Sequence, residues 1–174
     1  MVGFCSEKGA TMDSITAQLS IRDSLRDNLT DPYTLFSQSV DARDGSMWIF
    51  ADEPHAGAKY PKVEVLKATG GINSVIGMGS PYTDVEHNYY NVFFYVKNGT
   101  TIVVDGTTYK NSQVVDYYQG LIKSTIKNQF SSLTSAGGIK DVISLTTSEI
   151  DYDSDTQLYY GYITFRVRHF NVNC

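Results

Sequence analysis

The second half of the chain constrains the fold most, because its pattern predicts strand, turn, strand, turn and helix in direct succession. From Glu86 to Lys97, apolar and aromatic residues alternate with more polar ones, as in a strand with one buried face. Asn98-Gly99 and Asp105-Gly106 are dipeptides that readily adopt the positive φ angles of tight hairpin turns. We therefore expect residues 86–97 to pair antiparallel with residues 101–104, and the second turn to lead into a short strand at 107–109.

A long helix is predicted after this second turn. Asn111 or Ser112 can cap its start, and Gly137-Gly138 can end it. Lys123 and Lys127 fall on the side opposite to its apolar residues, so one face is expected to pack on a sheet. The apolar residues at helical spacing are Val114, Tyr117, Tyr118, Leu121, Ile122, Ile126, Phe130 and Leu133.

Strands are predicted at 139–146 and 157–172, joined by a loop in which the carboxylates of residues 149–155 alternate. Such carboxylates suit Ca²⁺, but the loop lacks the central Gly and closing Glu of a calcium-binding loop, which favours a solvated hairpin tip. In the last strand, the candidates for the core are Tyr159, Ile163, Phe165 and Val167. The other face is polar yet aromatic and carries Tyr160, Tyr162, Thr164, Arg166 and Arg168.

A second helix is predicted near the N-terminus. Asp13 or Ser14 can cap it, and Asp31-Pro32 ends it, because the residue before a proline is disfavoured in the α conformation. Arg22 and Arg26 are expected on a solvated face, with contact to a neighbouring subunit as the alternative. The apolar face of this helix is expected to consist of Ile15, Leu19, Leu25 and Leu29.

Between this helix and residue 86, the sequence pattern predicts strands at 47–50 and 62–66. Residues 70–81 are rich in Gly and Ser, which indicates a long loop that is either mobile or ordered by a partner. Residues 1–11 are small and polar and are expected to be flexible.

The composition is that of one folded domain over residues 1–174. Apolar residues make up 41% and charged residues 19%, and 174 residues suffice for a single core. The fold class is therefore predicted as α+β: an antiparallel or mixed β-sheet with one long helix packed on it and an N-terminal helix. The net charge is −5, and no run of Lys or Arg exceeds two positions, which argues against a surface that binds phosphate.

No motif in the chain predicts catalysis, a metal or a cofactor. His55, His87 and His169 have no partners at metal-ligand spacing, and Asp52-Glu53 beside His55 is better explained as a turn. Cys5 and Cys174 are expected to be free thiols, although a bridge between the two ends of the chain stays open. No stretch resembles a secretory leader or a membrane span, so we expect a protein that is not in a membrane.

The order of these elements resembles the tail terminator (tail completion) proteins of long-tailed bacteriophages and related archaeal viruses. The resemblance extends over most of residues 12–172 as an order of elements. It is carried by the N-terminal helix, the single long helix and three strand sequences: Tyr60-Pro61-Lys62-Val63-Glu64-Val65, Asn91-Val92-Phe93-Phe94-Tyr95-Val96 and Tyr160-Gly161-Tyr162-Ile163-Thr164-Phe165-Arg166-Val167. Residues 70–81 and the turn at Asp105-Gly106 depart from the simplest version of that pattern.

The resemblance implies a virion protein that works without catalysis or cofactor, assembled in the host cytoplasm. Copies of the chain, six by analogy, would form a ring that caps the tail tube and meets the neck, while genomic DNA passes through the lumen without specific binding. On this basis the expected contact between subunits is made by Tyr160, Tyr162, Arg166 and Arg168. Another connector, such as a neck or head-completion adaptor, or a tube subunit is an alternative. A small ligand-binding α+β domain or enzyme, with a pocket near His87 or Asp52-Glu53-His55, is a second one.

Overall fold

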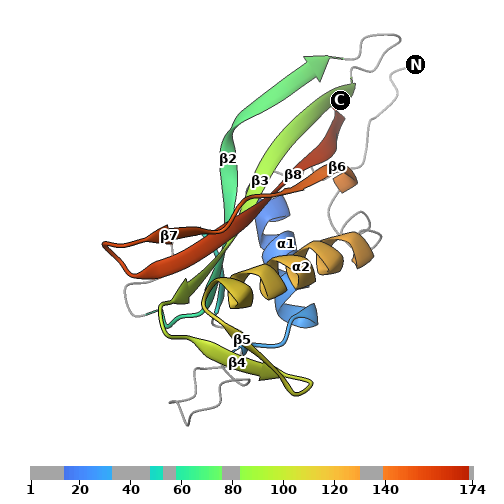
Figure 1. Ribbon diagram of the computed structural model, residues 1–174. Coiled ribbons are helices and arrows are strands. Elements are labelled where there is room, and N and C mark those ends of the chain that lie inside the picture. Colours follow the sequence, from blue (N-terminus) through green and yellow to red (C-terminus); the bar gives the residue numbers. More distant parts are fainter. Residues whose placement is uncertain (1–13, 33–47, 53–57, 76–82, 130–138, 173–174) are drawn as a thin grey trace, which may run out of the picture.

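The computed structural model describes residues 14–32, 48–52, 58–75, 83–129 and 139–172 (Figure 1). These residues form an α+β fold with a mixed sheet, as the sequence predicts. The helices are α1 (Ser14–Asn28) and α2 (Ser112–Asn128). The strands are β1 (Ile49–Ala51), β2 (Lys62–Val75), β3 (Thr83–Lys97), β4 (Thr101–Val104), β5 (Thr107–Lys110), β6 (Ile139–Thr147), β7 (Asp151–Asp153) and β8 (Leu158–Val172).

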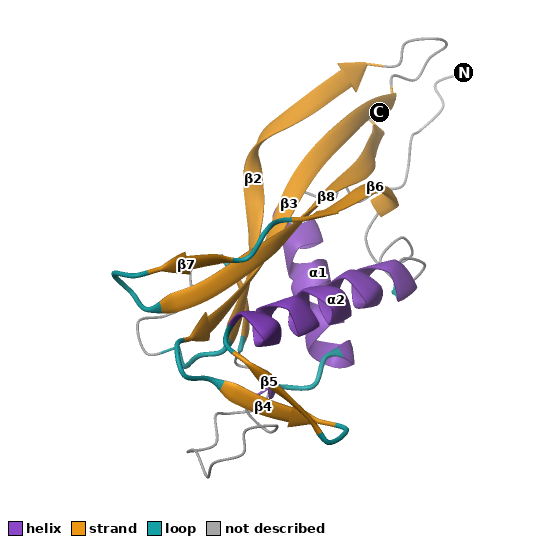
Figure 2. Cartoon of the chain, viewed as in Figure 1, coloured by secondary structure: helices purple, strands orange, loops and turns teal. Residues whose placement is uncertain are grey.

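Six strands form the main sheet, in the order β1-β2-β3-β8-β6, with β7 also paired to β8. β1 and β2 run parallel, and the other pairs in this sheet are antiparallel. β3 and β8 pair along their whole lengths, from Thr83 opposite Val172 to Lys97 opposite Leu158. The register between β6 and β8 shifts twice, so the edge strand β6 is irregular. Figure 2 shows β2, β3 and β8 continuing past the helices as a curved arm.

Both helices contribute to one apolar core on a single face of the sheet. Leu25 of α1, Tyr118 of α2 and Phe94 of β3 belong to the same buried cluster. The ring of Tyr118 stacks on that of Phe94 at 4.7 Å and meets Trp48 edge-on at 6.0 Å. The core residues predicted in the last strand, Ile163, Phe165 and Val167, are buried here, and Tyr159 is partly buried against them.

α1 begins at Ser14, as predicted, but it turns a different face to the core. The buried residues are Ala17, Ile21, Leu25 and Leu29, at intervals of one helical turn. Leu19 is 36% exposed, so its place in the apolar face was wrongly predicted. The reason is geometric, because residues six positions apart lie about 240° apart around an α-helix and Leu19 cannot share a face with Leu25. The side chain of Ile15 is outside the described part.

Arg26 is not on a solvated face, in contrast to the prediction. Its Nε and Nη2 both donate to the carbonyl oxygen of Ile49, at 3.0 and 2.6 Å. That carbonyl points away from β2, because Val63 N bonds the carbonyl of Trp48 and Asp52 N bonds that of Val65, and successive residues of a strand alternate their bonding side. The guanidinium thus covers the outer edge of β1 at Ile49, and its burial there lowers the pKa of Arg26.

α2 is not notably long, in contrast to the prediction of one long helix. It has 17 residues against 15 in α1, and it ends at Asn128. Phe130, Leu133 and Gly137-Gly138, which were predicted to extend and end it, lie outside the described residues. Asn111 occupies the N-cap position, as predicted, but its side chain makes no cap bond. Instead, its Oδ1 accepts from Gly99 N at 2.8 Å, and Gln113 Oε1 accepts from Lys110 N at 3.1 Å.

One of the two predicted hairpins forms and the other does not. At Asp105-Gly106, with φ of 49° and 77°, β4 turns into β5 and Val104 faces Thr107. At Asn98-Gly99 the chain also turns, with Thr100 N bonded to Lys97 O at 3.1 Å, but β4 does not pair with β3. Both edges of β3 are already occupied by β2 and β8, so β4 and β5 form a separate two-stranded sheet.

The loop predicted at 70–81 is partly strand. Residues 70–75 belong to β2, where Ile72 faces His87 and Val75 faces Asp84. A register shift between Ala68 and Ile72 accommodates the two glycines of this stretch within the ladder, which the composition could not indicate. The remainder of the predicted loop, from residue 76, lies outside the described residues, as do residues 1–11, Cys5 and Cys174.

Candidate interaction surface

The candidate site is the face of the main sheet that lies opposite the helices, which we call the open face. It is defined by Tyr89, Asn91, Phe93 and Tyr95 of β3 and by Tyr160, Tyr162, Thr164, Arg166 and Arg168 of β8. All nine side chains are half-buried, whereas their neighbours Val92, Phe94, Ile163 and Phe165 are fully buried on the helix side. The four residues predicted as an interface, Tyr160, Tyr162, Arg166 and Arg168, thus share one face, although this placement does not test their role.

Four aromatic rings form a continuous cluster on the open face, which we call the aromatic cluster. Phe93 stacks on Tyr95 at 5.8 Å and lies 4.9 Å from Tyr162 across the strand pair. Tyr95 lies 6.0 Å from its cross-strand partner Tyr160. These are ordinary separations for interacting aromatic pairs, and tyrosine hydroxyls keep such a surface wettable.

A buried charge pair borders the aromatic cluster on β2. Glu64 is only 8% exposed, and its Oε1 lies 2.9 Å from Lys62 Nζ. That ammonium also lies 5.0 Å from the ring centre of Tyr60 and 5.4 Å from that of Tyr95. The pKa of Tyr95 is raised, first by burial and then by the charge of Glu64 and a hydrogen bond to it. Burial, followed by the charge of Glu64 and its hydrogen bond, therefore keeps the Tyr95 hydroxyl protonated, while the Lys62 ammonium lies against the Tyr95 ring.

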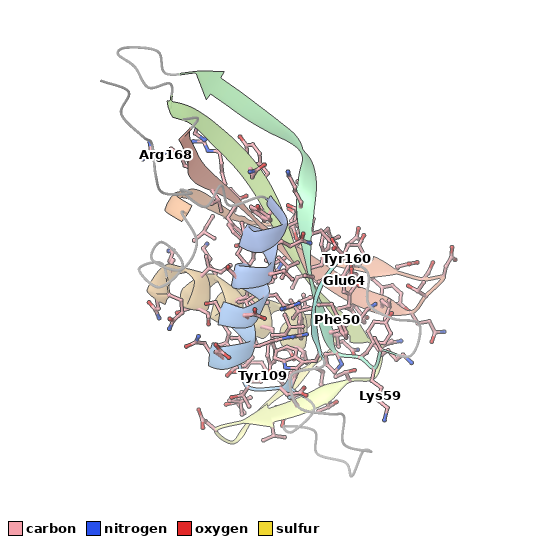
Figure 3. The ribbon with its side chains drawn as sticks, turned by 180° about the vertical axis from the view of Figure 1, so that it is seen from behind. Phe50, Lys59, Glu64, Tyr109, Tyr160 and Arg168 are labelled. Atoms are coloured by element: carbon pink, nitrogen blue, oxygen red, sulfur yellow. The ribbon has the colours of Figure 1, made fainter. Side chains whose placement is uncertain are left out.

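Toward the curved arm, the open face carries two arginines. The register places Tyr89 opposite Arg166, and it places His87 of β3 and Asp141 of β6 on either side of Arg168; we call His87, Arg166 and Arg168 the arginine end. Figure 3 shows Arg168 at the far end of the strands from Tyr160. Among the described residues, Nε of Arg166 and Nδ1 of His87 are buried without a hydrogen-bond partner. Such atoms have lost water on folding without gaining a described partner, which costs free energy.

The opposite end of β8 is acidic. The segment from residue 149 to residue 157 forms β7 and its turn into β8, and we call it the acidic hairpin. Its four carboxylates belong to Glu149, Asp151, Asp153 and Asp155, and no Lys or Arg occurs from residue 141 to residue 165. Figure 1 shows this hairpin projecting beyond the helices. The predicted hairpin tip is thus confirmed.

Internal hydrogen bonds give the acidic hairpin a fixed shape. Asp153 accepts from Thr156 Oγ1 at 2.6 Å and from Asp155 N at 2.9 Å, and these bonds, the Thr156 hydroxyl first, lower the pKa of Asp153. Asp151 accepts from the hydroxyl of Tyr160 at 3.1 Å, which raises the pKa of that tyrosine. Tyr152 is 40% exposed and packs on Tyr159 at 4.5 Å. The hairpin therefore presents charged oxygens and one aromatic ring to the solvent.

A pocket of about 300 Å³ lies on the other side of the molecule, away from the open face. It is lined by the end of α1, by α2 and by β4, at Asn28, Leu29, Thr30, Val104, Tyr117, Tyr118, Leu121, Ser124 and Thr125. The hydroxyl of Tyr118 donates to Thr30 O at 3.1 Å beside it. This is not the location that the ligand-binding alternative required, which was near His87 or the loop after Asp52.

Sequence reasoning missed several residues of the open face. Phe93 and Tyr95 carry the aromatic cluster, and the alternation in residues 86–97 was the signal that could have found them. Lys62 and Glu64 lie two residues apart on β2 and therefore share a face, but their position beside Tyr95 depends on the β2–β3 register, which the sequence did not indicate. Asp52 accepts from Gln18 Nε2 at 2.8 Å, whereas Glu53 and His55 lie outside the described residues.

Within the described residues, no three His, Cys, Asp or Glu side chains are grouped as a metal site would need, and neither helix has the length and apolar character to cross a membrane. The sequence matches no protein-family model, and comparison with curated proteins found no significant match.

Proposed function

We propose that this protein is a structural subunit of a viral tail, a tail terminator whose copies form a ring at the end of the tail tube and join it to the neck. The observation that carries the proposal is the open face, a half-buried aromatic and charged sheet surface that the core on the helix side leaves available. Its partners would be further copies of the chain, the tube and the neck proteins, with genomic DNA passing through the lumen. The work requires contact and shape, not bond-making.

The composition of the open face supports a role in assembly. Aromatic residues and arginine are the types enriched where proteins bind one another, and Phe93, Tyr95, Tyr160, Tyr162 and Arg166 supply them here from two adjacent strands. In the single chain, Lys62 pairs with Glu64 and lies against the Tyr95 ring, so this part of the surface is already ordered. A surface that is ordered in the single chain loses less conformational entropy when it binds.

The overall charge is compatible with the passage of DNA through a ring. The chain carries a net charge of −5, and a lumen of that sign would repel phosphates and let a duplex slide. A neck or head-completion adaptor or a tube subunit would also form a ring through which DNA passes. The number of copies in the assembled particle would distinguish these connectors from a tail terminator.

The decisive experiment is a measurement of the assembly state of the purified chain. Native mass spectrometry and light scattering over a range of concentrations should show a closed oligomer, and negative-stain images should show rings with a central hole. A chain that stays monomeric at all concentrations and binds a metabolite in the pocket beside Tyr118 would contradict the proposal and favour a ligand-binding domain.

A further inference from the structure

We infer that the ring contact is heterologous: the acidic hairpin of one copy docks on the arginine end of the open face of the next copy. This inference rests on the proposed function, because it assumes that copies of the chain assemble. It names which two surfaces meet, which the ring proposal leaves open.

The two ends of β8 carry surfaces of opposite charge. The acidic hairpin carries four carboxylates with no basic residue in the surrounding sequence. At the arginine end, Arg168 has Asp141 of β6 opposite it, whereas Arg166 has only the uncharged Tyr89 and Ser144 opposite it. Opposite potentials steer two surfaces together and set their register. Lys97 is exposed as well, but it lies opposite Leu158 at the base of the hairpin, where Asn98 N bonds Gln157 O in the same copy.

The burial and hydrogen bonding of the two surfaces in the single chain are also complementary. The arginine end is half-buried and holds Arg166 Nε and His87 Nδ1 without a hydrogen-bond partner among the described residues. The acidic hairpin has the complementary property, since hydrogen bonds keep Asp153 ionised and leave Glu149, Asp155 and the ring of Tyr152 exposed. A carboxylate arriving at the arginine end therefore meets the half-exposed guanidinium of Arg166, which has already lost part of its hydration at Nε.

The distance between the two surfaces along β8 prevents a contact within one copy. The acidic hairpin and the arginine end lie about ten residues apart along β8, which is roughly 33 Å at the rise of a strand. They cannot meet within one copy, because β8 is paired along the whole stretch between them and cannot fold back on itself. A contact between two different surfaces of identical subunits is head-to-tail, and such contacts close into a ring when the rotation between copies permits.

The test uses charge reversal in the full chain. Glu149→Lys/Asp155→Lys reverses the acidic hairpin, and Arg166→Glu reverses the arginine end. Each variant alone juxtaposes like charges, so we expect at least about a tenfold weaker assembly by light scattering, while circular dichroism shows the wild-type fold. The matched control is Asp27→Lys/Asp116→Lys, which makes the same charge change at exposed positions on the helices and should assemble as the wild type does.

An equimolar mixture of the two reversed variants gives the sharpest result. The lysine hairpin of one variant then faces the carboxylate that Arg166→Glu introduces in the other. The acidic hairpin of the second variant faces the unchanged Arg166 of the first, so assembly should return with alternating subunits and an even number of copies. Native mass spectrometry measures that alternation directly. A mixture that stays dissociated while both variants are folded would overturn the inference.

Further outcomes keep the inference separate from the proposed function. If Arg166→Glu does not fold, Arg166→Gln replaces it: combined with the reversed hairpin it must assemble better than the reversed hairpin alone, and equal assembly would overturn the contact. Wild-type rings that no reversal weakens would overturn the contact and leave the ring standing, whereas a monomeric wild type would overturn both. Loss of binding to a 20-base-pair duplex on Arg166→Glu, with assembly unchanged, would assign the arginine end to nucleic acid and overturn the inference too.

Discussion

Gly161 lies where β8 passes directly beneath α2, and the absence of a side chain there is a packing requirement. A methyl group on Gly161 would lie 2.9 Å from Gln119 Cδ and 3.2 Å from Val115 Cγ1, both on buried side chains of α2. Gly161→Ala should therefore lower the free energy of unfolding by about 1–3 kcal/mol, because a well-packed core does not yield to an added methyl. Urea unfolding followed by circular dichroism measures this change.

Gly120→Ala is the matched control for this prediction. Gly120 is the next residue of α2 after Gln119, it is exposed, and a methyl group there meets nothing within 4 Å. Because alanine is the better helix former, the control should be more stable than the wild type by about 0.5–1 kcal/mol. Equal effects of the two substitutions would contradict the packing described for Gly161.

At Tyr95 the raised pKa makes a prediction about alkaline pH. The native state holds the hydroxyl proton to a higher pH than the unfolded chain does, so the stability that this proton contributes is fully present below the ordinary pKa of 10.0 and is lost above it. The free energy of unfolding should decline from about pH 10 upward, with a slope below the limit of about 1.4 kcal/mol per pH unit because solvent screens this half-exposed site.

Tyr95→Phe tests the assignment of that slope. The variant should be less stable than the wild type at pH 8, since Glu64 loses the hydrogen bond from the hydroxyl, but its stability should decline less steeply between pH 9.5 and 11. Urea midpoints at several pH values provide the comparison. Parallel slopes for the two proteins would show that another tyrosine is responsible.

At the scale of single elements, the edge strand β1 depends on a side chain from a helix. Arg26 donates two hydrogen bonds to the outward carbonyl of Ile49, so Arg26→Ala should leave that acceptor without them and lower the free energy of unfolding by about 1–3 kcal/mol. Arg22→Ala is the control, because Arg22 pairs only with the adjacent exposed Asp23 in the interactions described, and it should change stability by less than about 0.5 kcal/mol. Thermal unfolding of both variants measures the difference.

The elements themselves were largely predictable from sequence, whereas their partners were not. The alternation in residues 86–97 and in residues 157–172 located β3 and β8 and assigned the faces of β8, because a strand with one buried face imposes a period of two. The pairing of β4 was wrongly predicted. A turn dipeptide such as Asn98-Gly99 specifies the local chain reversal, but it does not specify which strand pairs with β3. The same limit explains why the extension of β2 past residue 70 was missed.

The candidate site was predictable in part for the same reason. Placing Arg166 and Arg168 with Tyr160 and Tyr162 needed only the parity of one strand. The aromatic cluster needed the register between β3 and β8, and the position of Glu64 and Lys62 beside Tyr95 needed the register between β2 and β3, neither of which a local pattern specifies. Their role in assembly remains a prediction.

At the scale of the whole molecule, the open face should govern assembly more than folding. Phe93→Ser/Tyr162→Ser removes two rings of the aromatic cluster, each half-exposed in the single chain, and should weaken assembly by at least about tenfold because such rings are typical hot spots of interfaces. Sedimentation velocity measures the assembly, and circular dichroism reports the fold. Leu19→Ser, at an exposed position on α1, is the control and should leave the assembly state unchanged.

The two register shifts of β6, together with the guanidinium on β1, have a consequence for how large an assembly can become. A sheet grows without limit when a regular outer strand templates the backbone of another molecule, as in fibrils. Here one border of the main sheet is interrupted and the other is occupied at Ile49 by Arg26, so neither border offers a regular backbone template. The main sheet is thereby protected against open-ended stacking and suited to finite, countable association.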